Sequence, residues 1–110
     1  MSLEGERFMW ILLFFDLPTV SKVEKRQAQQ FRKFLIKDGY IMLQWSVYAR
    51  ICNGRDGLEK HLRRVQRELP DVGNVRTLEV TDRQFGKIKM LLGKKRIEEK
   101  KNGPSQLSLF

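Results

Sequence analysis

Cysteine and histidine are almost absent from this 110-residue sequence, which contains one of each, Cys52 and His61. A single cysteine excludes an internal disulfide and fits a reducing compartment. One cysteine and one histidine are also too few for a structural zinc site, and they give no support to a Cys–His nucleophile pair. We expect His61 to be a surface side chain on the flank of a helix, without a role as a general base.

Long apolar runs and acidic side chains are scarce as well. No apolar stretch approaches the ~20 residues that span a bilayer, and the first residues are acidic and too few for a secretory signal peptide. We therefore expect a cytoplasmic protein.

Thirteen Asp and Glu stand against 22 Lys and Arg, which gives a net charge of +9 and a pI near 10.1. Such an excess is typical of small domains that bind polyanions, either nucleic acid or an anionic membrane surface.

The most apolar stretch is residues 8–15, which runs straight into Asp16 and is followed two positions later by Pro18. Its aromatic content and its proline boundary favour a strand over a helix. Alternation gives both faces of this strand apolar side chains, so we expect a central strand that is covered on both sides. Asp16 is the only acidic residue between Arg7 and Ser21, and it stands at the carboxyl end of the strand.

Two amphipathic helices with one shared charge pattern are predicted. The first spans residues 22–38 after a capping box of Ser21 and Glu24, and the second has Asp56 and Glu59 as cap partners and ends at Pro70. Opposite their apolar stripes the helices carry Lys22, Arg26, Lys33, Lys37, Lys60, Arg63, Arg64 and Arg67. These residues form either a solvated surface or a nucleic-acid-binding face, and their repetition on both helices favours the second.

The rest of the chain predicts further strands. Residues 40–51 form either one strand or two short strands divided near Gln44, residues 75–81 form another, and residues 87–92 alternate like a strand. Residues 81–85 resemble a short capped turn. We expect the aromatic side chains of Tyr40, Trp45 and Trp10 in the core rather than stacked on bases.

This order of elements indicates an α+β domain in which two helices cover one face of an antiparallel sheet. No third helix is available for the other apolar face, so we expect self-association to cover it. We assign residues 1–7 to a disordered N-terminus or a non-native remnant, 8–92 to the folded domain and 93–105 to a charged linker. Residues 106–110 form either a strand that pairs with a dimer partner or a disordered tail.

Six segments resemble the Cas2 family of small CRISPR-associated proteins in order and spacing. They are Phe15-Asp16-Leu17-Pro18, Arg32-Lys33-Phe34-Leu35, Gly39-Tyr40, Gln44-Trp45-Ser46-Val47-Tyr48, Gly73-Asn74-Val75 and Val80-Thr81-Asp82-Arg83-Gln84-Phe85. The resemblance extends over residues 7–93, and the linker length is more similar to members from type II systems. It implies a ferredoxin-like fold, a symmetric homodimer packed sheet to sheet, and strand exchange by the C-terminus.

The resemblance also implies a role in spacer acquisition. A dimer of this family bridges two dimers of the Cas1 integrase and lies along captured double-stranded DNA, the prespacer. The family further implies metal-dependent phosphodiesterase activity on RNA or DNA at the aspartate that matches Asp16. Hydrolysis of this kind uses a divalent ion to polarise the phosphate and activate water. Because one carboxylate per chain is little for a metal site, we expect Mg²⁺, or Mn²⁺, between the two Asp16 of a dimer.

Two alternatives stay open. In one, Asp16 is a turn residue that accepts backbone N–H bonds ahead of Leu17 and Pro18, and the protein is a non-catalytic structural nucleic-acid-binding module. In the other, the chain is a single-stranded RNA-binding ferredoxin-like domain. That class carries an aromatic strand with Lys/Arg-Gly-aromatic spacing, which this sequence lacks. Ser46 and Tyr48 are expected to pack and to form hydrogen bonds rather than to act in catalysis.

Overall fold

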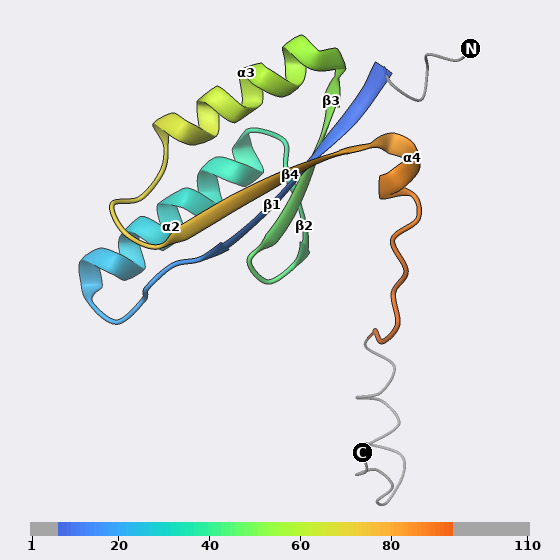
Figure 1. The fold of residues 1–110 in the computed structure, drawn as a ribbon. Coiled ribbons are helices and arrows are strands. Elements are labelled where there is room, and N and C mark those ends of the chain that lie inside the picture. The colour runs from blue at the N-terminus through green and yellow to red at the C-terminus, as the bar shows by residue number, and fades with distance from the viewer. Residues whose placement is uncertain (1–6, 94–110) are drawn as a thin grey trace, which may run out of the picture.

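The computed structural model of the protein describes residues 7–93. Its helices and strands are β1 (Phe8–Asp16), α2 (Lys22–Lys37), β2 (Ile41–Gln44), β3 (Val47–Asn53), α3 (Gly54–Arg67), β4 (Asn74–Thr81) and α4 (Asp82–Phe85). The four strands form one antiparallel sheet in the order β2-β3-β1-β4, and α2 and α3 cover one of its faces (Figure 1). This arrangement confirms the predicted α+β, ferredoxin-like fold.

Strand β1 is central, as predicted, because β3 pairs with one of its edges and β4 with the other. Alternate side chains of β1 point to opposite faces of the sheet. The helix-covered face carries the core, in which Ile11, Leu13 and Phe15 pack with Phe31, Leu35, Leu58 and Val65. Burying one side chain of this size stabilises the fold by roughly 1.5–3 kcal/mol, so the core fixes β1 and the residue that ends it.

The opposite face of the sheet is apolar and largely uncovered in the described chain. We call it the open face. Its apolar members are Phe8, Trp10, Leu12, Phe14, Ile41, Val47, Ala49, Ile51, Leu78 and Val80, and its polar members are Asp16, Asn53, Asn74 and Arg76. At one end Trp10 stacks on Phe85 of α4, with ring centroids 3.8 Å apart, and its Nε1 donates a hydrogen bond to Asp82 at 2.7 Å. The short α4 is thus held against this face by a single tryptophan.

Local signals placed most element boundaries correctly. The Ser21–Glu24 capping box begins α2, and a second box of Thr81 and Gln84 begins α4. The 40–51 region is two strands, β2 and β3, which separate just after Gln44.

Two predicted elements differ in the structure. Helix α3 already begins at Gly54, so the prediction of Asp56 and Glu59 as its cap partners is wrong. The reason is that Gly54, at φ +79°, turns the chain directly from β3 into the helix. Residues 87–92 lie in no strand, and Met90 and Leu91 are exposed. Alternating residues form a strand only where another strand pairs with them, and in the described chain this segment pairs with neither outer strand of the sheet, β2 or β4.

The predictions for residues 1–6 and 94–110, including the linker after Gly93 and the C-terminal strand at 106–110, lie outside the described residues. Within residues 7–93, neither long helix is apolar and long enough to cross a bilayer.

Candidate active site and nucleic-acid interface

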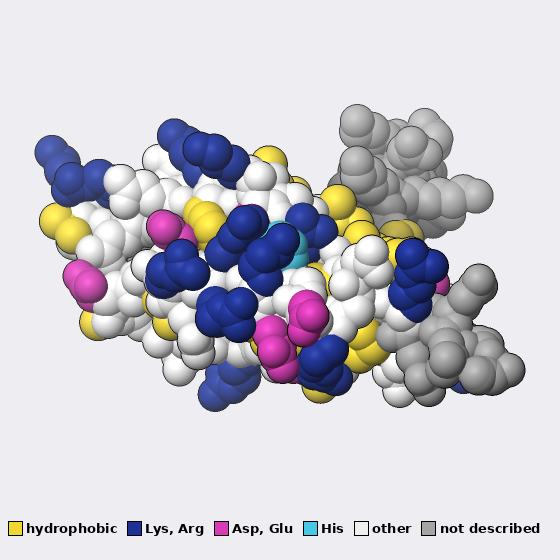
Figure 2. Space-filling view, turned by 90° about the horizontal axis from the view of Figure 1, so that it is seen from above, with side chains coloured by type: hydrophobic (Ala, Val, Ile, Leu, Met, Phe, Trp, Pro, Cys, Tyr) yellow, Lys and Arg dark blue, Asp and Glu magenta, His cyan; other side chains and the backbone are white. Residues whose placement is uncertain are grey.

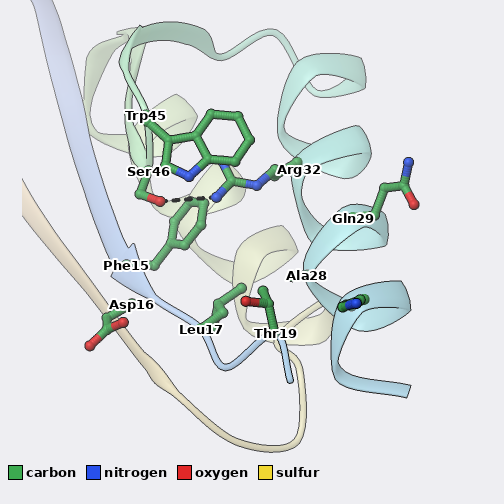
Figure 3. A pocket seen from close by; sticks show the side chains of 10 residues that line it. Phe15, Asp16, Leu17, Thr19, Ala28, Gln29, Arg32, Trp45 and Ser46 are labelled. Atoms are coloured by element: carbon green, nitrogen blue, oxygen red, sulfur yellow. Dashed lines mark hydrogen bonds between the residues drawn. The ribbon is translucent and has the colours of Figure 1, made fainter. Parts of the chain in front are cut away.

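Asp16 is the last residue of β1 and pairs with Asn74 of β4. Its side chain is exposed, and Figure 3 shows its carboxylate pointing away from the side chains on the helix side of the strand. Among the residues that the structure describes, none donates a hydrogen bond to this carboxylate. The alternative of a turn aspartate that accepts backbone N–H bonds is therefore without support. Both oxygens of Asp16 are available to a ligand.

The loop before β4 fixes the backbone around Asp16. Gly73 has φ +118°, and a Cβ at this position would approach Leu17 Cδ2 to 2.6 Å and the Asp16 carbonyl oxygen to 3.0 Å. Only glycine combines this backbone conformation with so close an approach. Gly73 is therefore a positioning residue for the end of β1, a role that the sequence indicated only through its place in a turn.

The donor set around Asp16 determines which metal site the chain can form. Among residues 7–93 there is no group of three or more His, Cys, Asp or Glu side chains that could hold a metal ion. Magnesium keeps several waters and takes one or two carboxylates together with substrate phosphate oxygens. The exposed carboxylate of Asp16 fits a site of that kind when a second carboxylate and the substrate complete it. It does not fit a metal site built within one chain.

A cluster around Arg32 of α2 lies on the helix side of the same strand end. The Arg32 guanidinium is stacked between two rings, 3.6 Å from the centroid of Trp45 and 4.8 Å from that of Phe15. It donates a hydrogen bond to Ser46 Oγ at 3.0 Å (Figure 3) and another to the Tyr48 hydroxyl at 3.4 Å. Arg32 thereby ties α2 to the turn between β2 and β3. The hydrogen-bonding role predicted for Ser46 and Tyr48 is confirmed.

Of the three aromatic residues predicted in the core, only Tyr40 lies there, because Trp10 belongs to the open face. Tyr40 is buried and Trp10 is half-buried, whereas Trp45 is 71% exposed. Trp45 lies in the turn after β2, where it covers Arg32 instead of entering the core. The sequence did not reveal this position, because a stacking arginine on a distant helix decides it.

The eight basic residues predicted to bind nucleic acid are all exposed. They are Lys22, Arg26, Lys33, Lys37, Lys60, Arg63, Arg64 and Arg67, here called the basic face. Figure 2 shows Lys and Arg side chains gathered over the middle of the helical side, with acidic side chains scattered among and beside them. Lys37 of α2 and Arg64 and Arg67 of α3 line one shared hollow of about 410 Å³. Their binding role stays a prediction.

His61 is buried, so the prediction of a surface histidine is wrong. Its Nδ1 lies 2.8 Å from Asp38 Oδ2, and Arg64 donates to Asp38 Oδ1 at 2.7 Å. Burial lowers the pKa of His61, and this effect with that of the nearby cations outweighs the opposite effect of Asp38. The imidazole is therefore neutral at pH 7 and donates its Nδ1 proton to the carboxylate. His61 connects α3 to the end of α2 and has no access to Asp16.

Cys52 is a free thiol inside the core. Burial raises the pKa of this thiol, and a protonated, buried cysteine is a poor nucleophile. The buried position of Cys52 is consistent with the expectation from the sequence that this cysteine is not a nucleophile.

Comparisons with known proteins place the chain in a family. The family model described as "CRISPR associated protein Cas2" matches residues 9–88. A relative from Acidovorax ebreus is 49% identical over 102 residues, which cover 93% of this chain and 100% of that protein. A relative from Campylobacter jejuni is 48% identical over 105 residues, which cover 96% of this chain and 73% of that protein. A relative from Flavobacterium psychrophilum is 45% identical over 105 residues, which cover 94% of this chain and 90% of that protein. All three are named CRISPR-associated endoribonuclease Cas2. The chain belongs to the Cas2 family of CRISPR-associated proteins.

Proposed function

We propose that the protein is a metal-dependent endonuclease of CRISPR adaptation that also serves as a dimeric DNA-binding adaptor. The observation that carries the nuclease role is the exposed Asp16 carboxylate, which has no partner among the described residues and stands at the end of the central strand. The names of the relatives, endoribonucleases, support the same role. RNA and DNA are both candidate substrates.

In the proposed mechanism Asp16 is the catalytic and metal-binding residue. A bound Mg²⁺ or Mn²⁺ ion would polarise the scissile phosphate and supply an activated water. The chain's own contribution is a carboxylate held at a fixed position by the core beneath Phe15 and by the close approach of Gly73. Because Asp16 belongs to the open face, a sheet-to-sheet dimer brings the two carboxylates to the same interface, where each subunit contributes one ligand.

A second copy of the chain is the proposed cover of the open face. Phe14, Ile51 and Leu78 are between 38% and 53% exposed in the single chain. A contiguous apolar surface of this kind is rare on a monomer and typical of an interface. In a twofold dimer the open face of one subunit packs against the open face of the other, so the apolar surface of both subunits is covered.

The basic face supports the adaptor role. It lies on the helical side, away from the proposed dimer interface, so a dimer presents two such faces to a duplex backbone. The proposed partners are double-stranded prespacer DNA and the Cas1 integrase, which the dimer bridges. Single-stranded RNA is the alternative partner, and a structural module without catalysis is the alternative function.

Cleavage assays test the nuclease role. Asp16→Asn should slow Mg²⁺-dependent cleavage of RNA or DNA by roughly 100-fold or more, and excess chelator should stop the wild type. Thermal unfolding should be unchanged, because the exposed side chain fills no core space. Asp56→Asn, which alters another exposed carboxylate in the first turn of α3, is the matched control and should cleave at the wild-type rate. Activity that survives in Asp16→Asn or in chelator refutes the proposed site.

Salt dependence tests the basic face. Binding of two unrelated duplexes should weaken by roughly 10³–10⁵ between 50 and 200 mM salt if six to ten phosphates are neutralised. The triple substitution of Lys60, Arg63 and Arg67 by Gln should reduce the slope of log K against log salt by about 2.7 and weaken both duplexes alike. Arg64 is left intact because it bonds Asp38, which the sequence alone did not show.

Arg55→Gln is the control for this series, because Arg55 is an exposed α3 arginine that pairs with Glu79 at 3.0 Å. Its slope should match that of the wild type. An unchanged slope in the triple variant means that the basic face is only a solvated surface.

A further inference from the structure

A second pocket lies at the end of β1, on the opposite side of the strand from the Asp16 carboxylate. It encloses about 530 Å³ and is lined by ten residues of β1, α2 and the turns beside them. Figure 3 shows Arg32, Trp45 and Phe15 close together, with Leu17 and Thr19 below them. Of the ten lining residues, the proposed mechanism uses only Asp16 and the packing of Phe15.

The pocket is electropositive. Lys25 and Arg32 line it, and its one acidic member, Asp16, turns its carboxylate away (Figure 3). Arg32 donates two hydrogen bonds, to Ser46 and Tyr48, and a guanidinium has further N–H donors than these two bonds use. Two cations with spare donors, beside the hydroxyl of Thr19, match the oxygens of a phosphate group.

Trp45 gives the pocket an aromatic platform. One face of its indole is stacked on Arg32 at 3.6 Å, and with 71% of the residue exposed the other face is open to solvent. The turn that presents it contains Ser46 at φ +68°, a left-handed conformation that costs free energy for a residue other than glycine. An indole held outside the core by a strained turn and an arginine stack is suited to stacking on a nucleobase.

We propose that this pocket binds one unpaired nucleotide of a nucleic acid, with its phosphate on Lys25 and Arg32 and its base stacked on Trp45. A base inside a duplex cannot present its face to an indole, so the ligand is single-stranded RNA or DNA, or an unpaired end. The inference goes beyond the proposed function, with which it shares only the premise that the partner is a nucleic acid. It requires neither the metal nor Asp16 chemistry.

The test measures binding by the Asp16→Asn protein, so that cleavage plays no part. Single-stranded RNA, single-stranded DNA and a blunt duplex of equal length are titrated by fluorescence anisotropy. Trp45→Ala should weaken binding of single strands by roughly 5- to 150-fold and leave the duplex unchanged, whereas Trp45→Phe should restore most of the loss. Lys25→Gln should lower the single-strand salt slope by about 0.7. A difference in affinity between single-stranded RNA and single-stranded DNA identifies which nucleic acid the pocket prefers.

A second measurement does not depend on how Trp45→Ala folds. In a Trp10→Phe protein the indole of Trp45 is the only one, and stacking of a base on it should quench its emission as single strands bind. Quenching by single strands without quenching by the blunt duplex supports the pocket. Saturable single-strand binding without quenching overturns the proposal, and so does an equal loss of duplex and single-strand affinity in Trp45→Ala. If the proposed nuclease activity proves to be absent, these binding results still test the pocket, because they do not depend on cleavage.

Discussion

Replacing Leu78 by lysine should dissociate the proposed dimer into monomers of 13.1 kDa and remove the nuclease activity. Leu78 lies on the open face, on the outer strand β4 opposite Leu12 of the central strand β1, and is 53% exposed in a single chain. Twofold symmetry buries two copies of the new ammonium group in one interface, and each costs several kcal/mol when it is buried without a partner. The dimer dissociation constant should therefore rise by at least roughly 1,000-fold, as measured by sedimentation equilibrium.

Ile36→Lys is the matched control, because Ile36 of α2 is 55% exposed on the helical side. A lysine near the carboxyl end of a helix is favourable, so this variant should remain dimeric and active. A Leu78→Lys protein that still sediments as the wild-type dimer shows that the open face is not the interface. A monomer that retains full activity shows that one Asp16 is sufficient.

Asp38→Ala should lower the free energy of unfolding by on the order of 3 kcal/mol, the typical cost of removing one partner from a buried polar pair. The Asp38 and His61 side chains are each 7% exposed. Alanine leaves the Nδ1 proton of His61 buried without an acceptor and releases Arg64. Urea unfolding measures the change. A loss below about 0.5 kcal/mol contradicts the described network.

The Asp38–His61 pair predicts that the free energy of unfolding decreases in acid. Burial lowers the pKa of His61 from its ordinary value of 6.5. Burial alone would raise the pKa of Asp38, but hydrogen bonds from His61 and Arg64 outweigh it and lower that pKa from 3.8. Both groups therefore bind protons more readily in the unfolded chain, so stability is full above pH 6.5 and is lost as the pH falls. His61→Gln should flatten the loss between pH 7 and 5 and leave the loss below pH 4.

The sequence predicted those parts of the fold that short-range patterns determine. The apolar run that ends at Asp16 is sufficient to define a central strand, and the capping boxes at Ser21 and Thr81 define two helix starts. Alternation also placed Asp16 on the opposite face of the strand from Phe15, which is where the structure has it. The charge pattern of α2 and α3 was read correctly as an exposed basic side.

The errors at His61 and Trp45 concern contacts between residues that are far apart in sequence. His61 has charged and apolar neighbours along its helix, and only Asp38, 23 positions away, explains its burial. Trp45 resembles a core residue until Arg32 is seen stacked on it. The role of Gly73 depends in the same way on its approach to Leu17. The spacing of residues within one helix or strand does not indicate such contacts between different elements.

The central claim is that the active site takes one Asp16 from each of two chains, and a purified mixed dimer tests it most directly. Wild-type and Asp16→Asn chains that carry different affinity tags are co-expressed, and the heterodimer is isolated through both tags. Its Mg²⁺-dependent cleavage rate is compared with those of the two homodimers. We predict that the heterodimer is as inactive as the Asp16→Asn homodimer, because the shared site lacks one of its two carboxylates. A heterodimer that retains about half of the wild-type rate contains one independent site per chain and contradicts the account.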